Sequence, residues 1–153
     1  ALVAATERGI CAVELGEDAG VLEQRLRAEF PRARLQRVDA GSDDFLAPRL
    51  RAVAERLSGR DGDVPVDLVG TAFQKRVWDA LMKIPAGQTR SYAELADALG
   101  APKAARAVAG ACASNRIAVL VPCHRIIRGD GSLGGYRWGL PVKQALLERE
   151  RAA

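Results

Sequence analysis

Residues 91–113 read SYAELADALGAPKAARAVAGACA, and this stretch predicts two short helices joined by a tight turn. Ser91 and Glu94 have the spacing of a capping box, in which the two residues satisfy each other's backbone N–H groups at the start of a helix. Gly100 provides the glycine that commonly follows a helix end, and the second helix is expected over residues 103–113. Two helices separated by a glycine turn are typical of the helix-turn-helix.

The second predicted helix has an almost smooth surface, because six of residues 104–111 are alanine or glycine. Lys103 and Arg106 are its long side chains, and both lie near its start. A helix that reads base edges in the major groove usually carries Asn, Gln or several Arg. A smooth helix with one arginine favours a largely sequence-independent approach through the minor groove, with Arg106 inserted into the base stack. The alternative is an alanine-rich helix packed inside the protein.

An apolar run, Ile117–Leu120, follows the helix pair and leads into Val121-Pro122-Cys123-His124-Arg125. The run predicts a buried strand, which the chain leaves through the proline. Because the thiolate is the nucleophile and a neighbouring imidazole or guanidinium lowers the thiol pKa, this pentapeptide predicts a reactive cysteine. The dipeptide alone favours a structural cysteine beside a surface histidine, and it is the surrounding sequence that favours the reactive one. Cys112, late on the second helix, is expected in the core.

Charge is unevenly distributed along the chain, although the net charge is only +4. Residues 1–70 contain 10 Lys and Arg against 13 Asp and Glu, whereas residues 71–153 contain 13 against 6. A basic half indicates a polyanionic partner, the alternative being a merely soluble basic surface. No apolar stretch approaches the ~20 residues that span a bilayer, and no signal-peptide pattern opens the chain, so no membrane partner is expected.

Three cysteines without CxxC spacing and a single histidine predict neither a disulfide framework nor a zinc site. We therefore expect no metal and no cofactor, and a cytoplasmic location. The chain begins at Ala1 without methionine, so it is expected to be a piece of a longer protein.

Two units are expected, over residues 1–62 and 66–153. The first contains predicted strands on either side of residues 6–9, a helix closed by Pro31, a strand over residues 35–38, and a helix over residues 46–57 that leads to a linker at 60–65. The second begins with a capping box at Thr71 and Gln74, and its other expected elements are the two helices above, a strand at Ile126–Ile127, a loop or wing over residues 128–132, and a terminal helix over residues 141–151.

Four features together resemble the O6-alkylguanine-DNA alkyltransferases, and most of all the C-terminal domain of the bacterial adaptive-response members: Ile84-Pro85-x-Gly87-x-Thr89-x-Ser91-Tyr92, Arg106-Ala107-Val108, Asn115, and Pro122-Cys123-His124-Arg125. The likeness covers essentially the whole chain. It implies an α/β fold, with a small ribonuclease-H-like domain over residues 1–62 and a winged-helix-like, mainly helical domain over residues 66–153.

The resemblance implies direct, single-turnover repair of O6-alkylguanine in duplex DNA after base flipping, with O4-alkylthymine as a second expected substrate. Cys123 would attack the alkyl carbon and keep it as a thioether. His124 would act as general base through water, and Glu150 would polarise it. Tyr92 would donate a proton or hydrogen bond to the departing guanine. Arg106 would fill the vacated stack. From the residues alone, Glu148 and Glu150 are equal candidates, and the resemblance favours Glu150.

Further residues take expected roles from the same resemblance. Asn115 would hold the turn between the second helix and the active-site strand. The guanine pocket would be lined by Val121, Tyr136 and Arg137, with Lys143 nearby. The expected DNA-facing residues are Thr89, Ser91, Lys103, Arg106, Ala107 and Arg116. The implied partner is double-stranded DNA, bound by a monomer in a bacterial cytoplasm. The N-terminal zinc domain of full-length adaptive-response proteins has no counterpart here, so their regulatory activity is not expected of this chain.

Three alternatives remain. A non-enzymatic alkyl-base-binding protein of the same fold would flag lesions but lack the cysteine. A plain helix-turn-helix regulator would bind a specific sequence and have a dispensable Cys123. A cysteine hydrolase would show turnover, but has no use for a helix-turn-helix.

Overall fold

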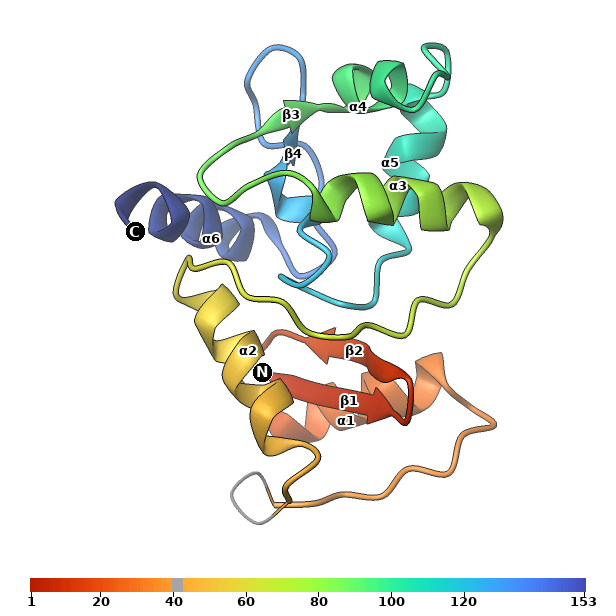
Figure 1. The fold of residues 1–153 in the computed structure, drawn as a ribbon, viewed down its shortest axis with the longest axis vertical. Helices are drawn as coiled ribbons and strands as arrows, with labels where there is room; N and C mark the ends of the chain where they lie inside the picture. The colour runs from red at the N-terminus through yellow and green to blue at the C-terminus, as the bar shows by residue number, and fades with distance from the viewer. Residues whose placement is uncertain (40–42) are drawn as a thin grey trace.

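The computed structural model describes residues 1–39 and 43–153, which fold into two units (Figure 1). The N-terminal unit contains β1 (Leu2–Thr6), β2 (Gly9–Glu14), α1 (Ala19–Glu29) and α2 (Ala47–Leu57). The C-terminal unit contains α3 (Ala72–Met82), β3 (Arg90–Ser91), α4 (Tyr92–Ala98), α5 (Ala105–Ala113), the 3-10 turn η1 (Cys123–Arg125), β4 (Ile126–Ile127) and α6 (Leu140–Ala152). No helix in the described ranges has both the length and the apolar character needed to cross a bilayer.

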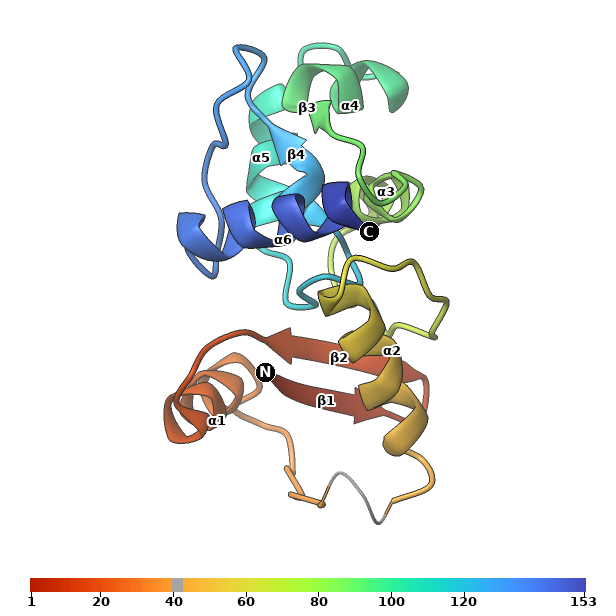
Figure 2. The same ribbon diagram turned by 90° about the vertical axis from the view of Figure 1, so that its left-hand side faces the viewer.

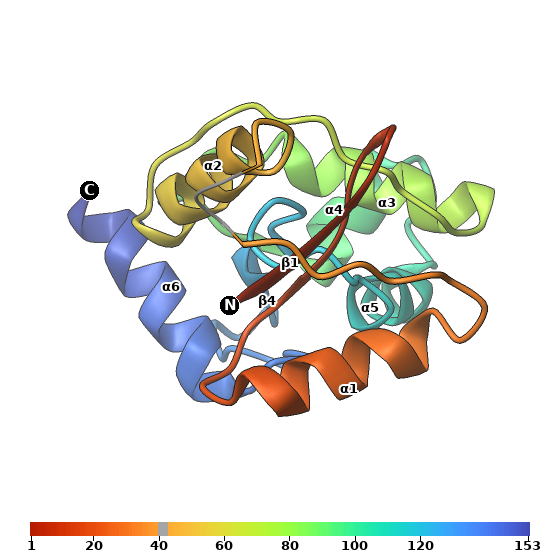
Figure 3. The same ribbon diagram turned by 90° about the horizontal axis from the view of Figure 1, so that it is seen from below.

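The N-terminal unit is built on an antiparallel hairpin. Strands β1 and β2 pair with Thr6 opposite Gly9, and α1 and α2 lie on opposite sides of the hairpin (Figures 2 and 3). Gly9 has φ +151°, and a Cβ there would lie 2.6 Å from the carbonyl oxygen of Pro65. The predicted turn, the two strands on either side of it and the two predicted helices of this unit are present. The close contact at Gly9 shows that the linker packs against β2.

The strand predicted over residues 35–38 is wrong. This segment is irregular and runs below the hairpin, where Leu35 and Val38 are half-buried and the two residues between them are exposed (Figure 1). Among the strands of the described ranges, β1 pairs with β2 alone. A strand needs a partner for its backbone N–H and C=O groups, and residues 35–38 pair with no strand in the described ranges.

Helices α3 and α4 of the C-terminal unit start where their capping boxes predict. Ser91 Oγ accepts from the backbone N–H of Glu94 and the Glu94 carboxylate accepts from that of Ser91, while Thr71 and Gln74 do the same at α3. Helix α5, however, begins at Ala105 rather than at residue 103. Residues 101–104 form a turn closed by the bond from Ala104 N to Ala101 O, so α-helical bonding begins only beyond it.

The strand predicted over residues 117–120 is also wrong. Ile117 makes a single parallel bridge to Val13, and the chain then turns, with the N–H of Leu120 bonded to the carbonyl of Ala118. Val119 has φ 61°, the one positive φ among non-glycine residues in the described ranges, and this is a strained conformation for a β-branched side chain. The whole segment is buried, so local turns satisfy the backbone groups that a sheet would otherwise satisfy.

One hydrophobic core runs through both units. Ile10 and Val13 of β2 belong to the same buried cluster as Leu81 of α3, Val108 of α5 and Leu146 of α6. Two parallel bridges cross the expected boundary, from Ile10 to Val66 and from Val13 to Ile117. The separation into residues 1–62 and 66–153 therefore stays a prediction about domains, since the units share their interior.

Comparing alanine variants of two glycines tests how closely the end of α2 packs against α6. Gly59 and Gly100 follow α2 and α4, with φ +86° and +71°. A Cβ on Gly59 would lie 2.8 Å from the carbonyl oxygen of Arg149, whereas no described atom lies within 4 Å of one on Gly100. Replacing either by alanine forces a positive φ on a residue with a side chain and should cost about 1 kcal/mol.

Gly59→Ala should cost roughly 1–3 kcal/mol more than Gly100→Ala, because backbone atoms of α6 must move. Urea unfolding of the two variants and the wild type measures this difference. Equal losses for the two variants would contradict the close approach of α2 to α6.

Candidate active site

Cys123 opens the turn η1 and is almost completely buried. Its Sγ accepts a hydrogen bond from the Nδ2 of Asn115 at 3.2 Å, and the same amide donates to the carbonyl of Val121 at 2.9 Å. The Oδ1 of Asn115 accepts from the backbone N–H of Ile117 at 2.9 Å. The amide of one asparagine therefore holds the turn after α5 and also touches the sulfur.

The Cys123 thiol is protonated at rest. Burial raises its pKa, and this effect outweighs the hydrogen bond from Asn115 and the positive charge of Lys143, which lower it. Cys112 is buried close by, and burial raises its pKa to about 12, with the nearby Cys123 adding to the rise. Formation of a thiolate at Cys123 consequently requires a base.

His124 is the next residue of η1 and faces α6. Its Nε2 lies 2.7 Å from the Oε1 of Glu150, and within the described residues its buried Nδ1 has no hydrogen-bond partner. Burial lowers the pKa of His124, and the hydrogen bond and charge of Glu150 oppose this only in part. The imidazole is therefore neutral at neutral pH. With its Nε2–H donated to the carboxylate, Nδ1 is the basic nitrogen.

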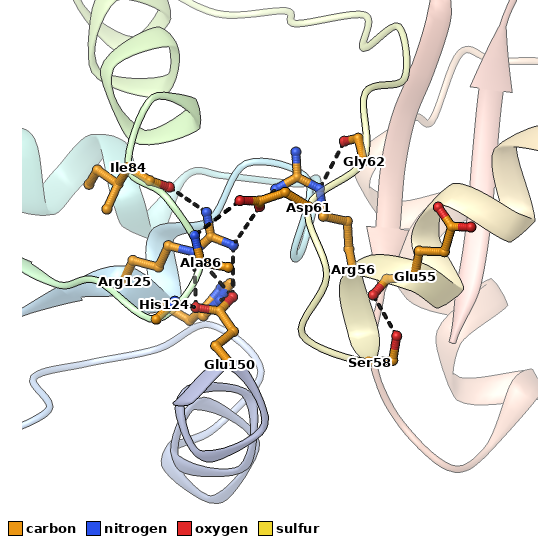
Figure 4. A network of polar contacts seen from close by, with 11 residues as sticks. Glu55, Arg56, Ser58, Asp61, Gly62, Ile84, Ala86, His124, Arg125 and Glu150 are labelled. Atoms are coloured by element: carbon orange, nitrogen blue, oxygen red, sulfur yellow. Dashed lines mark hydrogen bonds and ion pairs between the residues drawn. The ribbon is translucent and has the colours of Figure 1, made fainter. Parts of the chain in front are cut away.

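Glu150 is buried on α6 and remains ionised. It accepts hydrogen bonds from His124 and from the guanidinium of Arg125 at 2.8–3.1 Å (Figure 4). It also accepts one from the backbone N–H of Gly87 at 3.1 Å. Burial raises the pKa of Glu150, but the bonds from His124 and Arg125 outweigh it and lower the pKa to about 2. Glu148, the other sequence candidate, is exposed and accepts from Gln144.

Arg125 also belongs to the site, although no separate role is expected for it from the sequence. Its side chain is as deeply buried as that of His124, and it also donates to the carbonyl of Ile84 and to the Oδ1 of Asp61 at 3.3 Å. One signal could have found it. A buried arginine needs a carboxylate, and Arg125 stands between two apolar runs that predict burial. Asp61, in the linker, carried no such signal.

Two tyrosines approach the Cys123 side of the site. Burial raises the pKa of the half-buried Tyr92, and the nearby Cys112 and Cys123 thiols raise it further, so its hydroxyl stays a donor. The ring of Tyr136 meets that of His124 edge-on, with centroids 6.5 Å apart, and burial raises the pKa of its hydroxyl too. Within the described residues, the buried Tyr136 hydroxyl has no hydrogen-bond partner.

Lys143, expected beside the guanine pocket, is a buried structural cation. Its Nζ donates to the carbonyls of Ile126 at 2.5 Å, of Leu133, and of Gly135 at 3.3 Å. Burial lowers the pKa of its ammonium group, while the nearby Cys123 and Cys112 raise it. Lys143 thus fixes the loop between β4 and α6 to β4.

The two arginines expected at the pocket and at DNA point toward the N-terminal unit. Arg137 pairs with Glu29 and lies 3.6 Å from Glu14, and Arg116 pairs with Glu29 at 2.8 Å. Arg116 also lies beyond the C-terminal end of α5, whereas Arg106 lies in its first turn. The guanidinium groups of Arg116 and Arg137 therefore join the two units, and the structure does not bring Arg116 together with Arg106.

Helix α5 has one buried face and one exposed face. Val108, Ala111 and Cys112 face the core, so the alternative of a packed alanine helix holds for that side alone. The other side exposes Lys103 in the preceding turn, Arg106, Ala107 and Gly110. Of the remaining expected DNA-facing residues, Thr89 and Ser91 are half-buried, and the Ser91 hydroxyl is engaged in capping α4.

Residues 72–152 match the family described as 6-O-methylguanine DNA methyltransferase, DNA binding domain. The chain belongs to this methyltransferase family. It is 50% identical over 151 residues to the bifunctional transcriptional activator/DNA repair enzyme Ada of Escherichia coli, covering 97% of this chain and 42% of that protein. It is 58% identical over 90 residues to a methylated-DNA–protein-cysteine methyltransferase of Mycobacterium tuberculosis, covering 59% of this chain and 54% of the relative. The chain thus spans about half the length of these relatives, or less.

Solved structures of the methyltransferase family share the fold. An enzyme from Pyrococcus kodakaraensis superposes with a TM-score of 0.71 at 27% identity, covering 97% of this chain and 88% of that one. A Mycobacterium tuberculosis enzyme in complex with DNA gives 0.67 at 44% identity, covering 78% of each chain. The predicted α/β class is confirmed at the level of mixed helices and small sheets. The predicted resemblance to the methyltransferase family is confirmed as well.

The low pKa of Glu150 predicts a pH-dependent contribution to stability. A carboxyl whose pKa falls from its ordinary 4.5 to about 2 on folding stabilises the protein above pH 4.5, and this stabilisation is lost as the pH falls toward 2. Glu150→Gln should therefore lower the free energy of unfolding by roughly 3 kcal/mol at pH 7, and by less at each step below pH 4.5.

Urea unfolding at several pH values measures this difference. Glu148→Gln, which removes an exposed carboxylate from the same helix, is the matched control and should change stability little at any pH. A difference between wild type and Glu150→Gln that stays constant from pH 7 to pH 3 would overturn the assignment.

Proposed function

We propose that this chain repairs O6-alkylguanine in duplex DNA by transferring the alkyl group irreversibly to Cys123. The observation that carries the proposal is the buried Cys123 thiol next to the His124–Glu150 pair, in a unit that also presents the smooth face of α5. Family membership supports it, because relatives over this region are named methylated-DNA–protein-cysteine methyltransferases.

The chemistry balances without a cofactor. The thiol proton of Cys123 passes through one water molecule to Nδ1 of His124, and Glu150 stabilises the resulting imidazolium. The sulfur then forms a bond to the alkyl carbon while the bond from that carbon to O6 breaks, and its electron pair stays on guanine. Tyr92 donates to the guanine as this negative charge develops. Guanine regains one ring N–H, and this proton balances the one that Cys123 gave up. The thioether on Cys123 is stable, so one protein molecule repairs one lesion.

DNA binding is proposed to use the exposed face of α5 in the minor groove. The target base must leave the stack to reach a buried thiol, and Arg106 is the exposed side chain that would take its place. Ala107 and Gly110 leave the neighbouring surface flat, which allows close approach without reading base edges. A relative solved in complex with DNA supports this partner.

Finer parts of the proposal follow the resemblance. O4-alkylthymine is proposed as a second substrate, and a monomer in a bacterial cytoplasm as the working form. Residues 1–62 are proposed to act as a ribonuclease-H-like support domain, since they consist of a hairpin between two helices. Residues 66–153 are proposed to be winged-helix-like, with α4 and α5 as the helix pair and the loop after β4 as the wing.

A non-enzymatic lesion-binding protein is the second candidate, and the thiol of Cys123 beside a base argues against it. A plain helix-turn-helix regulator would need base-reading side chains on α5, where alanine and glycine stand instead. A cysteine hydrolase would turn over, whereas the thioether formed here is final.

Incubation with duplex DNA containing one O6-methylguanine should add one methyl group to the peptide that holds Cys123, at one methyl per protein molecule. Peptide mass spectrometry measures the transfer. Cys123→Ala should abolish it, while Cys112→Ala should retain a methylated Cys123. Loss of the lesion with an unmodified Cys123 would overturn the proposed function.

Arg106→Ala should slow alkyl transfer from duplex DNA by about tenfold or more, because nothing then replaces the extruded base. Transfer from free O6-benzylguanine, which needs no flipping, should change less than twofold. Single-turnover rates at saturating duplex measure the effect. Lys103→Ala removes a cation from the same end of α5 and is the matched control. It should weaken duplex binding and leave the saturated rate unchanged. An equal loss on the free base would refute the role of Arg106.

A further inference from the structure

We propose that Asp61, in the segment between the two units, is a positioning residue for the His124–Glu150 pair and acts through Arg125. This inference rests on the proposed function, because it assigns Asp61 a part in activating Cys123. It also extends the site to the N-terminal side of the molecule, since Asp61 is held from α2 (Figure 4).

The carboxylate of Asp61 connects three segments of the chain. Its Oδ1 accepts from Arg125 Nη2 at 3.3 Å and from Arg56 Nη1 at 2.9 Å, and its Oδ2 accepts from the backbone N–H of Ala86 at 3.2 Å. Arg56, on α2, also donates to the carbonyl of Gly62, which fixes the backbone next to Asp61. The side chain of Asp61 is 51% exposed, and it nevertheless has three donors, from Arg125, Arg56 and Ala86.

Arg125 and His124 compete for the same oxygen of Glu150. The Oε1 atom of Glu150 accepts from His124 Nε2 at 2.7 Å, from Arg125 Nη2 at 2.8 Å and from Arg125 Nε at 3.1 Å. The same Nη2 also donates to Asp61. Asp61 therefore offsets part of the guanidinium charge that otherwise acts on Glu150, which leaves Glu150 a stronger acceptor for His124.

Removing the charge of Asp61 acts on His124 in one direction. Without it, the positive charge of Arg125, which disfavours a proton on the imidazole, is less balanced. The other charged or titratable groups that face the cluster are unchanged: Glu150 of α6, Cys123 of η1, Lys143 of α6, Tyr136 of the preceding loop, and Asp63 beside Arg56. The pKa of His124 should therefore fall.

The test uses Asp61→Asn in the full chain, which keeps the shape and the acceptor oxygen and removes the charge. His124 is the only histidine, so its imidazole resonances can be followed by NMR without ambiguity. The pKa of His124 should fall by about 0.5 in the variant. The acid limb of the rate of methyl transfer to Cys123 should move to lower pH by the same amount, and the plateau rate should fall about twofold because the base is weaker.

Asp63→Asn is the matched control. It removes a carboxylate from the same segment that makes no hydrogen bond or ion pair with Arg125 among the described residues, and both measurements should stay at the wild-type values. Asp61→Glu should restore the position of the acid limb, at least in part. A purely structural role for Asp61 would lower the melting temperature or weaken DNA binding without moving the acid limb.

The inference is overturned by a His124 titration that is the same in wild type and Asp61→Asn. It is overturned equally by a histidine that does not titrate in either folded protein, or by an equal shift in Asp63→Asn. The titration requires no alkyl transfer. A wild-type protein that fails to methylate Cys123 would refute the proposed function, while the histidine shift would still decide the role of Asp61.

Discussion

The carboxylate of Glu150 is buried against η1 and accepts hydrogen bonds from His124, Arg125 and the backbone of Gly87. A carboxylate removed from water is costly unless donors fill its oxygen atoms. These donors come from η1 and from the loop before β3, and Glu150 itself comes from α6. All of them reach the carboxylate only if α6 lies across η1 and that loop. The requirement to satisfy one carboxylate thus fixes the three segments that enclose Cys123, and it orients His124 through its Nε2.

Local signals in the sequence predicted the helices well, because capping is decided within four residues. The Ser91–Glu94 pair begins α4, and Gly100 ends it whatever the rest of the chain does. The two wrong strands, over residues 35–38 and 117–120, failed for one reason. A strand needs a neighbouring strand to pair with, and that neighbour is set by tertiary structure and cannot be read from a short stretch of sequence. Among the site residues, the motif identified Cys123 and His124. Asp61 looked like an ordinary linker charge, since only the fold brings it to Arg125.

The excess of positive charge in the second half of the chain has two origins: pairing with acidic residues of the first half, and exposed cations. The sequence alone does not distinguish them. Part of the excess is complementarity between the units, because Arg116 and Arg137 of the basic half pair with Glu29 of the acidic half. Arg125 likewise pairs across the two halves, with Asp61. These arginines are not free to bind a polyanion. Lys103 and Arg106, by contrast, are exposed beside the smooth face of α5.

A protein that reacts once gains from a nucleophile that is inert until its substrate is in place. Burial raises the pKa of Cys123, so the thiol resists adventitious alkylation and oxidation. The same burial lowers the pKa of His124, which keeps the imidazole neutral and able to accept a proton. The same buried environment thus keeps Cys123 and His124 uncharged. The charged groups Glu150 and Arg125 contact His124 or its partner and not the sulfur. Charge separation across the pair becomes favourable only when an alkylated base supplies the electrophile. On the proposed function, the thiolate therefore forms only when the alkylated base is bound, and not in the free protein. A protein that reacts once requires this order of events.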